Sequence, residues 1–234
     1  FRKGKRRQLS LQTKIILSYY FFFVIAGTFL FWILEHNNTF ESLSAPLQWC
    51  NAFFTSVSSR SGGYMSVHPD DLQHASLFTL MISAFIGSAP GSTGSGIKLT
   101  TAAIFIGTIS SAITGKPVVD INKRSIAKDQ VYKALAIVAL AMVWIVLITF
   151  FLLITENTWP FLDILFESVS AFTTLVISIG ITPYLSVIGK IFIALSMFIG
   201  RIGSLTLLIA THVSILTSDT SRSPHGSPFA GLQI

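Results

Sequence analysis

The segment FIGSAPGSTGSGIKLTT, Phe85 to Thr101, decides the fold of this 234-residue chain. Apolar sequence surrounds it from residue 75 to residue 113, but its glycines and proline break a helix between Gly87 and Lys98. Non-helical backbone at membrane depth leaves N–H and C=O groups that lipid cannot satisfy, so it persists only inside protein or beside a water-filled path. The segment therefore predicts a membrane crossing whose helix is broken in mid-span.

Two uninterrupted apolar runs lie on either side of this broken crossing. Residues 15–34 and 134–154 carry no charge, and about twenty residues at about 1.5 Å each match a hydrocarbon core of about 30 Å. A signal peptide is the alternative for the first run, because FRKGKRR precedes it. However, the run is longer than the roughly 7 to 15 residues of a signal-peptide core, and no A-x-A-like site follows it. Both runs are predicted to be membrane-spanning helices.

The basic residues mark two loops. Six of the sixteen Lys and Arg residues lie in residues 2–14 and five lie in residues 116–133. Loops rich in Lys and Arg stay in the cytoplasm, so the N-terminus and the linker 114–133 are both expected there. The chain must then cross the membrane an even number of times between them, which makes 75–113 the return crossing. Neither loop interleaves aromatic with basic residues, so the net charge of +6 does not indicate nucleic-acid binding.

A short amphipathic stretch and a polar loop precede the return crossing, and the same order recurs later. PLQWCNAFFTSVSSRSGGY, Pro46 to Tyr64, is too short to cross and ends in a glycine-rich turn. WPFLDILFESVSAFTTLVISIG, Trp159 to Gly180, follows the span 134–154 in the same way and precedes an apolar segment from residue 188 to residue 213. An inexact repeat of this kind indicates duplication.

The predicted fold class is an all-α integral membrane protein made of repeated units of helix, re-entrant pore loop and helix. The inner helix of the first unit is broken at mid-membrane. The predicted parts are a basic cytoplasmic segment 1–14, a first unit 15–113, a basic cytoplasmic linker 114–133, a second unit 134–216 and a disordered Ser/Pro/Gly-rich tail 217–234. Within the units, Phe54-Thr55 aligns approximately with Phe172-Thr173.

Polar loops held at membrane depth suit a cation. Potassium filters replace the hydration shell of the ion with rings of backbone carbonyls, and glycine lets that backbone adopt positive φ. Each short helix also directs its negative dipole end toward its loop. The loops therefore favour a cation pathway, with ordinary extracellular loops of apolar composition as the alternative.

The broken segment closely resembles the intramembrane loop of the Trk/Ktr/HKT potassium transporter superfamily, through its pattern G-S-T-G-x-G-I-K. SRSGGY, Ser59 to Tyr64, resembles the third-repeat filter of that family, usually R-T-A-G-F, and FIGRIGSLT, Phe198 to Thr206, resembles its fourth-repeat inner helix. The resemblance covers nearly all of residues 13–213. It implies the C-terminal half of a TrkH/KtrB-like membrane subunit, since the family builds one pore from four units. The chain begins at Phe1 rather than Met, which also predicts missing upstream sequence.

The resemblance implies which residues form the filter and its gate. The backbone carbonyls that would line half of a K⁺ filter are those of Ser61, Gly62, Gly63, Thr174, Leu175 and Val176. The expected gate consists of small residues and one lysine of the broken crossing together with an arginine of the last helix: Gly87, Pro90, Gly91, Ser92, Thr93, Gly94, Ser95, Gly96, Lys98 and Arg201. Lys98 would place a positive charge under the filter.

Arg201 is an ionisable residue within an apolar run, which in a membrane is a functional-site hypothesis by default. It is expected to line the pore below the filter as an electrostatic barrier. A structural arginine paired with a carbonyl is the alternative.

Val176 departs from the family pattern, because it stands where the fourth-repeat filter has a glycine. A β-branched residue is stiff and disfavours positive φ. Two readings follow: this quadrant uses a different backbone geometry with weaker potassium selectivity, or the protein has diverged. Sodium permeation therefore stays open.

Three further charged residues have structural expectations. Arg60 is expected to face the rim of the filter or a buried acid such as Glu167. Asp163 and Glu167 are expected to stabilise the N-terminus of their short helix. The string GSTGSGIK approaches the phosphate-binding pattern G-x-x-x-x-G-K-[ST], but Ile97 stands before the lysine, so an ATPase reading fails.

The predicted function is uptake of K⁺, a monovalent cation, across the plasma membrane by a multi-pass protein that is not an enzyme. Na⁺ or H⁺ stays open as a coupling ion, and no organic cofactor is expected. The resemblance implies the missing N-terminal half, a homodimer and a cytosolic nucleotide-binding regulatory subunit as partners, besides the lipid bilayer. The alternative is a membrane-bound enzyme, or a non-conducting structural or receptor subunit that keeps the fold.

Overall fold

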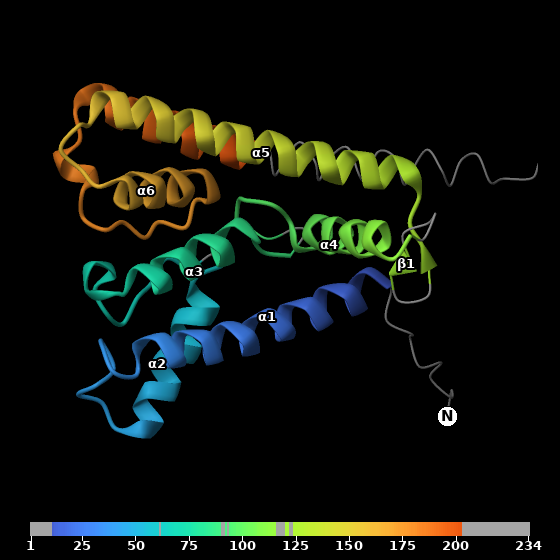
Figure 1. Cartoon of the computed structure of the whole chain (residues 1–234), viewed down its shortest axis with the longest axis horizontal. Helices are drawn as coiled ribbons and strands as arrows, with labels where there is room; N and C mark the ends of the chain where they lie inside the picture. The colour runs from blue at the N-terminus through green and yellow to red at the C-terminus, as the bar shows by residue number, and fades with distance from the viewer. Residues whose placement is uncertain are drawn as a thin grey trace, which may run out of the picture.

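Two long helices set the length of the molecule (Figure 1). The computed structural model describes residues 11–60, 62–89, 92, 94–115, 120–121 and 124–202. Within them, α1 (Leu11–Glu35) and α5 (Lys128–Thr155) are the two helices long and apolar enough to cross a membrane. Both helices are longer than the uncharged runs 15–34 and 134–154, because a membrane-spanning helix can continue into the polar layer beyond the hydrocarbon core.

The outer faces of the two long helices are apolar. Phe22 of α1 is 63% exposed and Leu140 of α5 is 70% exposed, and large apolar neighbours share these faces. A water-soluble protein rarely exposes so continuous an apolar surface. The faces have the composition of surfaces in contact with lipid.

The first unit continues through α2 (Ala45–Ser58), the short η1 (Pro69–Asp71), α3 (His74–Phe85) and α4 (Leu99–Ile113). A proline in the first turn of α2 suits a helix start, where its missing N–H has no helical acceptor. Between α3 and α4 the chain doubles back on itself: Gly87 N donates to Ile97 O at 2.9 Å and Ile97 N donates to Phe85 O at 3.1 Å. The interrupted apolar segment is therefore two helices joined by a closed loop.

The linker between the units contains a feature that hydropathy did not predict. Strands β1 (Asp120–Ile121) and β2 (Arg124–Ser125) pair antiparallel as a two-residue ladder beside α4. The remaining regular structure of the described residues is helical. The predicted tail 217–234 and the end of the second unit beyond residue 202 lie outside the described residues.

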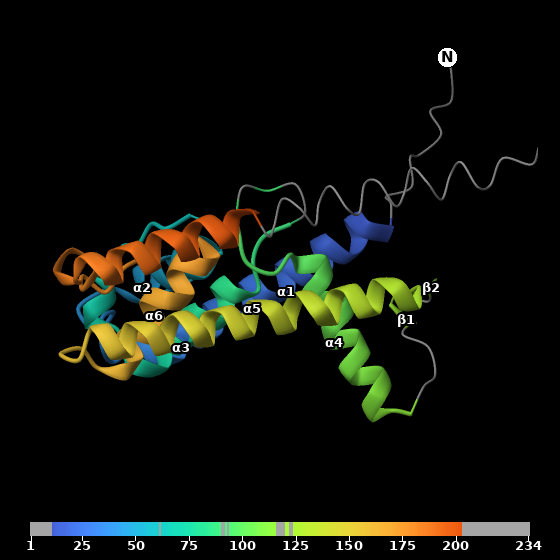
Figure 2. The same cartoon turned by 90° about the horizontal axis from the view of Figure 1, so that it is seen from above.

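The second unit repeats the order of the first. After α5 come α6 (Phe161–Thr173), η2 (Thr182–Tyr184) and a helix over residues 187–202, which in Figure 2 runs beside α5. The contacts between this pair of helices include a hydrogen bond from Trp144 Nε1 to Ser196 Oγ at 3.3 Å and the stacked rings of Phe151 and Phe192 at 5.2 Å. The short helices α2 and α6 lie at the same end of the molecule, away from β1 (Figure 1).

A buried glutamate ends the long helix of each unit and ties it to the start of the inner helix. Glu35 Oε1 accepts a hydrogen bond from Gln73 N at 3.0 Å, directly before α3. Glu156 Oε1 accepts from Ser186 N at 3.0 Å, directly before the helix 187–202. This shared contact supports a common origin of the two units more directly than their sequences do.

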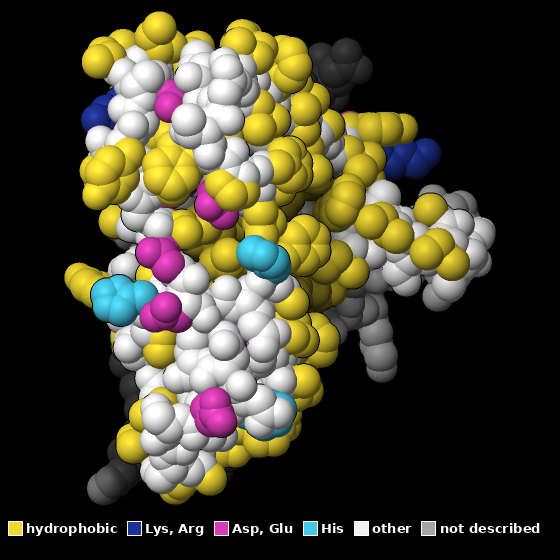
Figure 3. Space-filling view, turned by 60° about the vertical axis from the view of Figure 1, so that its left-hand side comes forward, with side chains coloured by type: hydrophobic (Ala, Val, Ile, Leu, Met, Phe, Trp, Pro, Cys, Tyr) yellow, Lys and Arg dark blue, Asp and Glu magenta, His cyan; other side chains and the backbone are white. Residues whose placement is uncertain are grey.

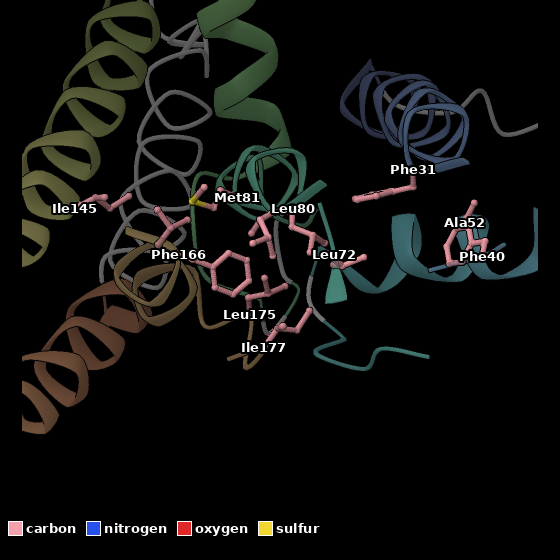
Figure 4. Close-up of a cluster of buried hydrophobic side chains, with 13 residues drawn as sticks. Phe31, Phe40, Ala52, Leu72, Leu80, Met81, Ile145, Phe166, Leu175 and Ile177 are labelled. Carbon is pink, nitrogen blue, oxygen red and sulfur yellow. The ribbon is translucent and has the colours of Figure 1, made fainter. Parts of the chain in front are cut away.

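The main apolar core lies where the two units meet, between α3 and α6 (Figure 4). Leu80 and Met81 of α3 pack in one cluster with Phe166 of α6. Leu175 and Ile177, from the loop after α6, belong to the same cluster and are 2% and 5% exposed. The loop of the second unit is thus anchored on a helix of the first.

Candidate functional site

The polar loops of the two units touch at Gly63 and Val176. Gly63 has a φ of 66° and Val176 has a φ of 70°, both in the left-handed region. A Cβ placed on Gly63 would lie 2.6 Å from Leu175 O and 3.0 Å from Val176 Cβ. Two residues of the same unusual conformation, one from each unit, therefore meet backbone to backbone.

A serine of each short helix holds the residue that follows the left-handed position. Ser58 Oγ donates to Tyr64 O and accepts from Tyr64 N at 3.0 Å, while Ser170 Oγ donates to Ile177 O at 2.5 Å. These contacts make Ser58 equivalent to Ser170. The alignment of Phe54-Thr55 with Phe172-Thr173 is therefore wrong, because aromatic-polar pairs recur at several places in these apolar helices.

Backbone N–H groups tie each loop to its helix. Gly62 N donates to Ser58 O at 3.0 Å, Thr174 N donates to Ala171 O at 3.2 Å and Leu175 N donates to Ser170 O at 3.0 Å. Thr174 also adopts a left-handed φ of 50°. Of the residues predicted to supply filter carbonyls, Ser61 lies outside the described residues, and the others lie in these two adjoining turns.

Val176 keeps the backbone conformation that a glycine would adopt there. Its φ differs from that of Gly63 by 4°, from 70° and 66°. Its side chain is 73% exposed. At residue 176 itself the valine therefore does not change φ. Besides the side chain at the contact, the second loop has a left-handed Thr174 and one more residue between Ser170 and Ile177 than the first has between Ser58 and Tyr64.

A pocket of about 270 Å³ opens beside this contact. It is lined by Gly63, Met65, Ser66, Val67, His68 and Pro69 on one side and by Val176, Ile177 and Ser178 on the other. Acidic side chains gather at this end of the molecule (Figure 3). Asp70 of η1 and Asp163 of α6 lie near enough for their charges to interact. Such a field raises the local concentration of cations.

Glu167 lies behind the second loop, and its carboxylate is bound on both oxygens. Oε1 accepts from Ile179 N at 3.1 Å and from Ser178 Oγ, and Oε2 accepts from Thr182 Oγ1 at 2.9 Å. The expectation that Glu167 stabilises the helix N-terminus is wrong, since it lies in the middle of α6 and turns to the loop. Asp163 does lie in the first turn of α6.

Arg60 packs against aromatic rings of α1 instead of pairing with Glu167. Its guanidinium carbon lies 5.5 Å from the centre of the Tyr20 ring and 5.1 Å from that of Phe23. Arg60 is 5% exposed, and its Nε and Nη1 have no hydrogen-bond partner among the described residues. The pairing with Glu167 is wrong because the loop hydroxyls already occupy that carboxylate.

The loop between α3 and α4 is held closed by Lys98. Its Nζ donates to Gly94 O at 2.6 Å and to Ser92 O at 3.2 Å. At the turn, Gly96 has a φ of 77°, and a Cβ there would lie 3.5 Å from Thr173 Cγ2 of the second unit. The loop therefore lies directly against the end of α6.

Several predicted gate residues come together here and others are not described. Pro90, Gly91 and Thr93 lie outside the described residues. Gly87 and Ser95 approach closely, because a Cβ on Gly87 would lie 2.4 Å from Ser95 O. The hydroxyls of Ser88 and Ser95 are buried without a hydrogen-bond partner in the described part of the chain.

Arg201 brings a second positive charge to this loop. Its guanidinium is close enough to the Lys98 ammonium for the two charges to repel. The helix that carries it passes very close to α6, since a Cβ on Gly200 would lie 1.9 Å from Phe172 O. Lys98 and Arg201, far apart in sequence, thus share one site.

Sequence reasoning missed the buried acids and serines that hold the loops. Glu35 and Glu156 are each the first charged residue after a long apolar run, and this position could have indicated a structural role at the helix end. Ser58 and Ser170 carried no comparable signal, because serines are frequent in both short helices.

The sequence has relatives among known proteins. The profile of the TrkH family, described as cation transport protein, matches residues 5–223. Ktr system potassium uptake protein B of Vibrio alginolyticus is 37% identical over 201 residues, which are 85% of this chain and 44% of that protein. Potassium/sodium uptake protein NtpJ of Enterococcus hirae is 33% identical over 208 residues, 87% of this chain and 46% of that protein.

The fold also has a solved counterpart. The crystal structure of the potassium transporter TrkH from Vibrio parahaemolyticus matches with a TM-score of 0.64 at 19% sequence identity, over 85% of this chain and 43% of that one. At this identity the match concerns the fold alone. The chain spans about half the length of the relatives and of the structure that it matches.

Proposed function

Because the chain belongs to the TrkH family of cation transport proteins, we propose that its two units form half of a potassium pathway across the plasma membrane. The observation that carries the proposal is the contact of Gly63 with Leu175 O and Val176. Two equivalent turns from two equivalent units meet there, as adjacent quadrants of one ring of carbonyls would. Such a ring replaces the hydration shell of a cation.

The ion path runs from an acidic mouth, past the paired turns, to the Lys98 loop. Asp70 and Asp163 attract cations at the mouth. The turns of Gly62-Gly63 and of residues 174–176 supply the carbonyls, together with Ser61. The buried hydroxyls of Ser88 and Ser95 lack partners in the described part of the chain, which suits a place where water or an ion passes.

The gate is the loop between α3 and α4, closed by the bonds from Lys98 Nζ to Gly94 O and Ser92 O. It opens when these bonds release and the small residues of the loop move aside. Arg201 adds a positive charge that opposes cation passage below the filter. The remaining gate residues, Pro90, Gly91 and Thr93, belong to the same loop.

Potassium is the proposed cargo, and sodium is a second one favoured by Val176. Ktr system potassium uptake protein B is named for potassium alone, whereas NtpJ is named for potassium and sodium. The valine side chain at the turn is exposed toward the pocket, where it restricts the approach of the two loops. A filter of altered spacing discriminates less well between the two ions. Na⁺ and H⁺ stay open as coupling ions.

The complete protein has partners beyond this chain. Two further units, from an N-terminal half, close the ring of carbonyls, since two quadrants leave the path open on one side. The protein crosses the membrane several times, with the N-terminus and the linker 114–133 in the cytoplasm. A homodimer of separate pores and a cytosolic nucleotide-binding subunit, docked on the cytoplasmic loops, complete the system.

Growth of a potassium-uptake-deficient strain tests the function. The full-length protein is expected to restore growth at low potassium, and ⁸⁶Rb⁺ uptake is expected to be inhibited by excess K⁺ more than by excess Na⁺. Correct membrane insertion without any rubidium or sodium uptake would contradict transport and favour a non-conducting subunit.

A further inference from the structure

Val176 occupies a backbone conformation that its own chemistry disfavours. At a φ of 66° Gly63 meets no steric penalty, but at 70° the branched Cβ of Val176 is crowded by its own backbone. A strained residue persists only where its surroundings over-determine it. Something in the second unit must therefore hold this turn that the first unit does not need.

The serine contacts do not explain the difference, because both units have them. Ser58 Oγ binds the O and the N of Tyr64, and Ser170 Oγ binds the O of Ile177, so the unit with glycine has the fuller serine contact of the two. The bond from Leu175 N to Ser170 O fixes the chain before Val176. The chain beyond Ile177 needs a separate constraint.

The units differ one helical turn before these serines. In the second unit Glu167 stands there, 4% exposed, and binds Ser178 and the backbone N–H of Ile179. In the first unit the equivalent residue is Thr55, which is 2% exposed and whose hydroxyl has no partner in the described part of the chain. The turn that contains Val176 therefore has a carboxylate packed behind it, that of Glu167. The turn that contains Gly63 has the hydroxyl of Thr55 in the same place.

We propose that Glu167 is a positioning residue which holds Val176 in the left-handed conformation and so replaces the conformational freedom of the missing filter glycine. Ser170 fixes the carbonyl of Ile177 and Glu167 fixes the N–H of Ile179, so the backbone on the far side of Val176 cannot relax to negative φ. The charged acceptor makes stronger hydrogen bonds than a neutral one. The prediction for rubidium uptake rests on the proposed function, whereas the prediction for thermal unfolding does not.

A double-mutant cycle in the full-length protein tests this dependence. The four proteins are wild type, Glu167→Gln, Val176→Gly and the double variant. Glutamine keeps the size of the side chain, but it carries no charge and has one acceptor oxygen where the carboxylate has two, so the three contacts to Ser178, Ile179 and Thr182 are not all kept as charged acceptor contacts. Glu167→Gln is expected to lower ⁸⁶Rb⁺ uptake about tenfold with Val176 and less than about threefold in the Val176→Gly background, a coupling of the usual size for residues linked through one hydrogen-bond network.

The same cycle is measured by thermal unfolding of the detergent-purified proteins, which needs no transport. The drop in midpoint caused by Glu167→Gln is expected to be smaller when residue 176 is glycine. A coupling seen in unfolding with no transport by any of the four proteins would support the positioning role and contradict the proposed function. Equal drops in the two backgrounds would overturn the positioning role.

Glu156→Gln is the matched control. Glu156 is 7% exposed and binds a backbone N–H and a serine hydroxyl, as Glu167 does, but at the start of the helix 187–202. Its effect on the unfolding midpoint is expected to be the same with valine or glycine at 176. If Glu156→Gln were rescued by Val176→Gly as well, the rescue would be general stabilisation and the proposal would fail.

Discussion

Gly63 and Val176 lie against each other with φ angles of 66° and 70°, and a Cβ built on Gly63 would lie 3.0 Å from the Cβ of Val176. Residues 63 and 176 therefore share the left-handed conformation and differ in their side chains at the contact. The contact has space for the side chain of one residue only. Because residue 63 is glycine, the valine side chain at 176 fits without a clash.

The substitution Gly63→Ala is expected to abolish transport. The new methyl group would lie 2.6 Å from Leu175 O, which is backbone and cannot move without moving the second loop. Left-handed φ adds roughly 1 kcal/mol for a residue with a Cβ. Rubidium uptake by the full-length variant is expected to fall at least about tenfold at equal membrane expression.

Gly115→Ala is the control for that experiment. Gly115 has the same φ of 66°, but a Cβ there meets nothing within 4 Å. It therefore carries the conformational cost without the clash. Uptake close to wild type is expected, and an equal loss in both variants would show that the clash at residue 63 is not the cause.

Replacing Val176 is expected to sharpen ion selectivity. Val176→Gly removes both the side chain at the contact and the strain at a φ of 70°, so residue 176 matches Gly63. The ratio of K⁺ to Na⁺ inhibition of rubidium uptake is expected to rise. Val176→Ala keeps a Cβ and separates the two causes: an equal rise with alanine assigns the effect to side-chain size. An unchanged ratio in both variants would contradict a role of residue 176 in selectivity.

The sequence allowed the break between α3 and α4, the two long apolar helices and the two short helices to be predicted, because hydropathy and glycine act locally. The conformation of Val176 could not be predicted in this way. Intrinsic preference argues against positive φ, and the groups that override it, Glu167 and Ser170, act through contacts with residues 177–182. The closeness of Lys98 and Arg201 likewise depends on how the two units pack, which no local pattern encodes.

Glu35 is expected to matter for stability. Its carboxylate accepts from Asn38 Nδ2 at 2.7 Å, Thr39 Oγ1 at 2.9 Å and Gln73 N at 3.0 Å, and it is fully buried. Glu35→Ala would leave several donors without an acceptor, at about 1–3 kcal/mol for each one that stays buried. The thermal midpoint of the purified protein is expected to fall clearly. Glu41→Ala, at an exposed carboxylate, is the control, and an equal fall there would contradict the assignment.

Lys98→Met is expected to raise basal flux. Methionine keeps the unbranched apolar stem but cannot donate to Gly94 O or Ser92 O, so the loop loses the bonds that close it. Lys190→Met is the control, because Lys190 Nζ also donates to a carbonyl, that of Pro183 at 2.8 Å, but at the opposite end of the path. Rubidium efflux from loaded vesicles measures the leak. If Lys98→Met does not raise the efflux above that of Lys190→Met, the closing role is wrong.

Arg201→Gln is expected to raise flux for a different reason, the loss of charge. A unit charge about 5 Å from a passing cation opposes it by roughly 3 kcal/mol at an effective dielectric constant of about 20. Solvent and salt reduce this value, so an increase of several-fold is expected. Arg201→Lys keeps the charge and is expected to keep the low flux. Equal flux in wild type, Arg201→Lys and Arg201→Gln would contradict the barrier and favour a structural arginine. The proposed roles also predict different salt dependence: an effect of Arg201→Gln that comes from repulsion should shrink at high ionic strength, whereas an effect of Lys98→Met that comes from lost loop bonds should persist.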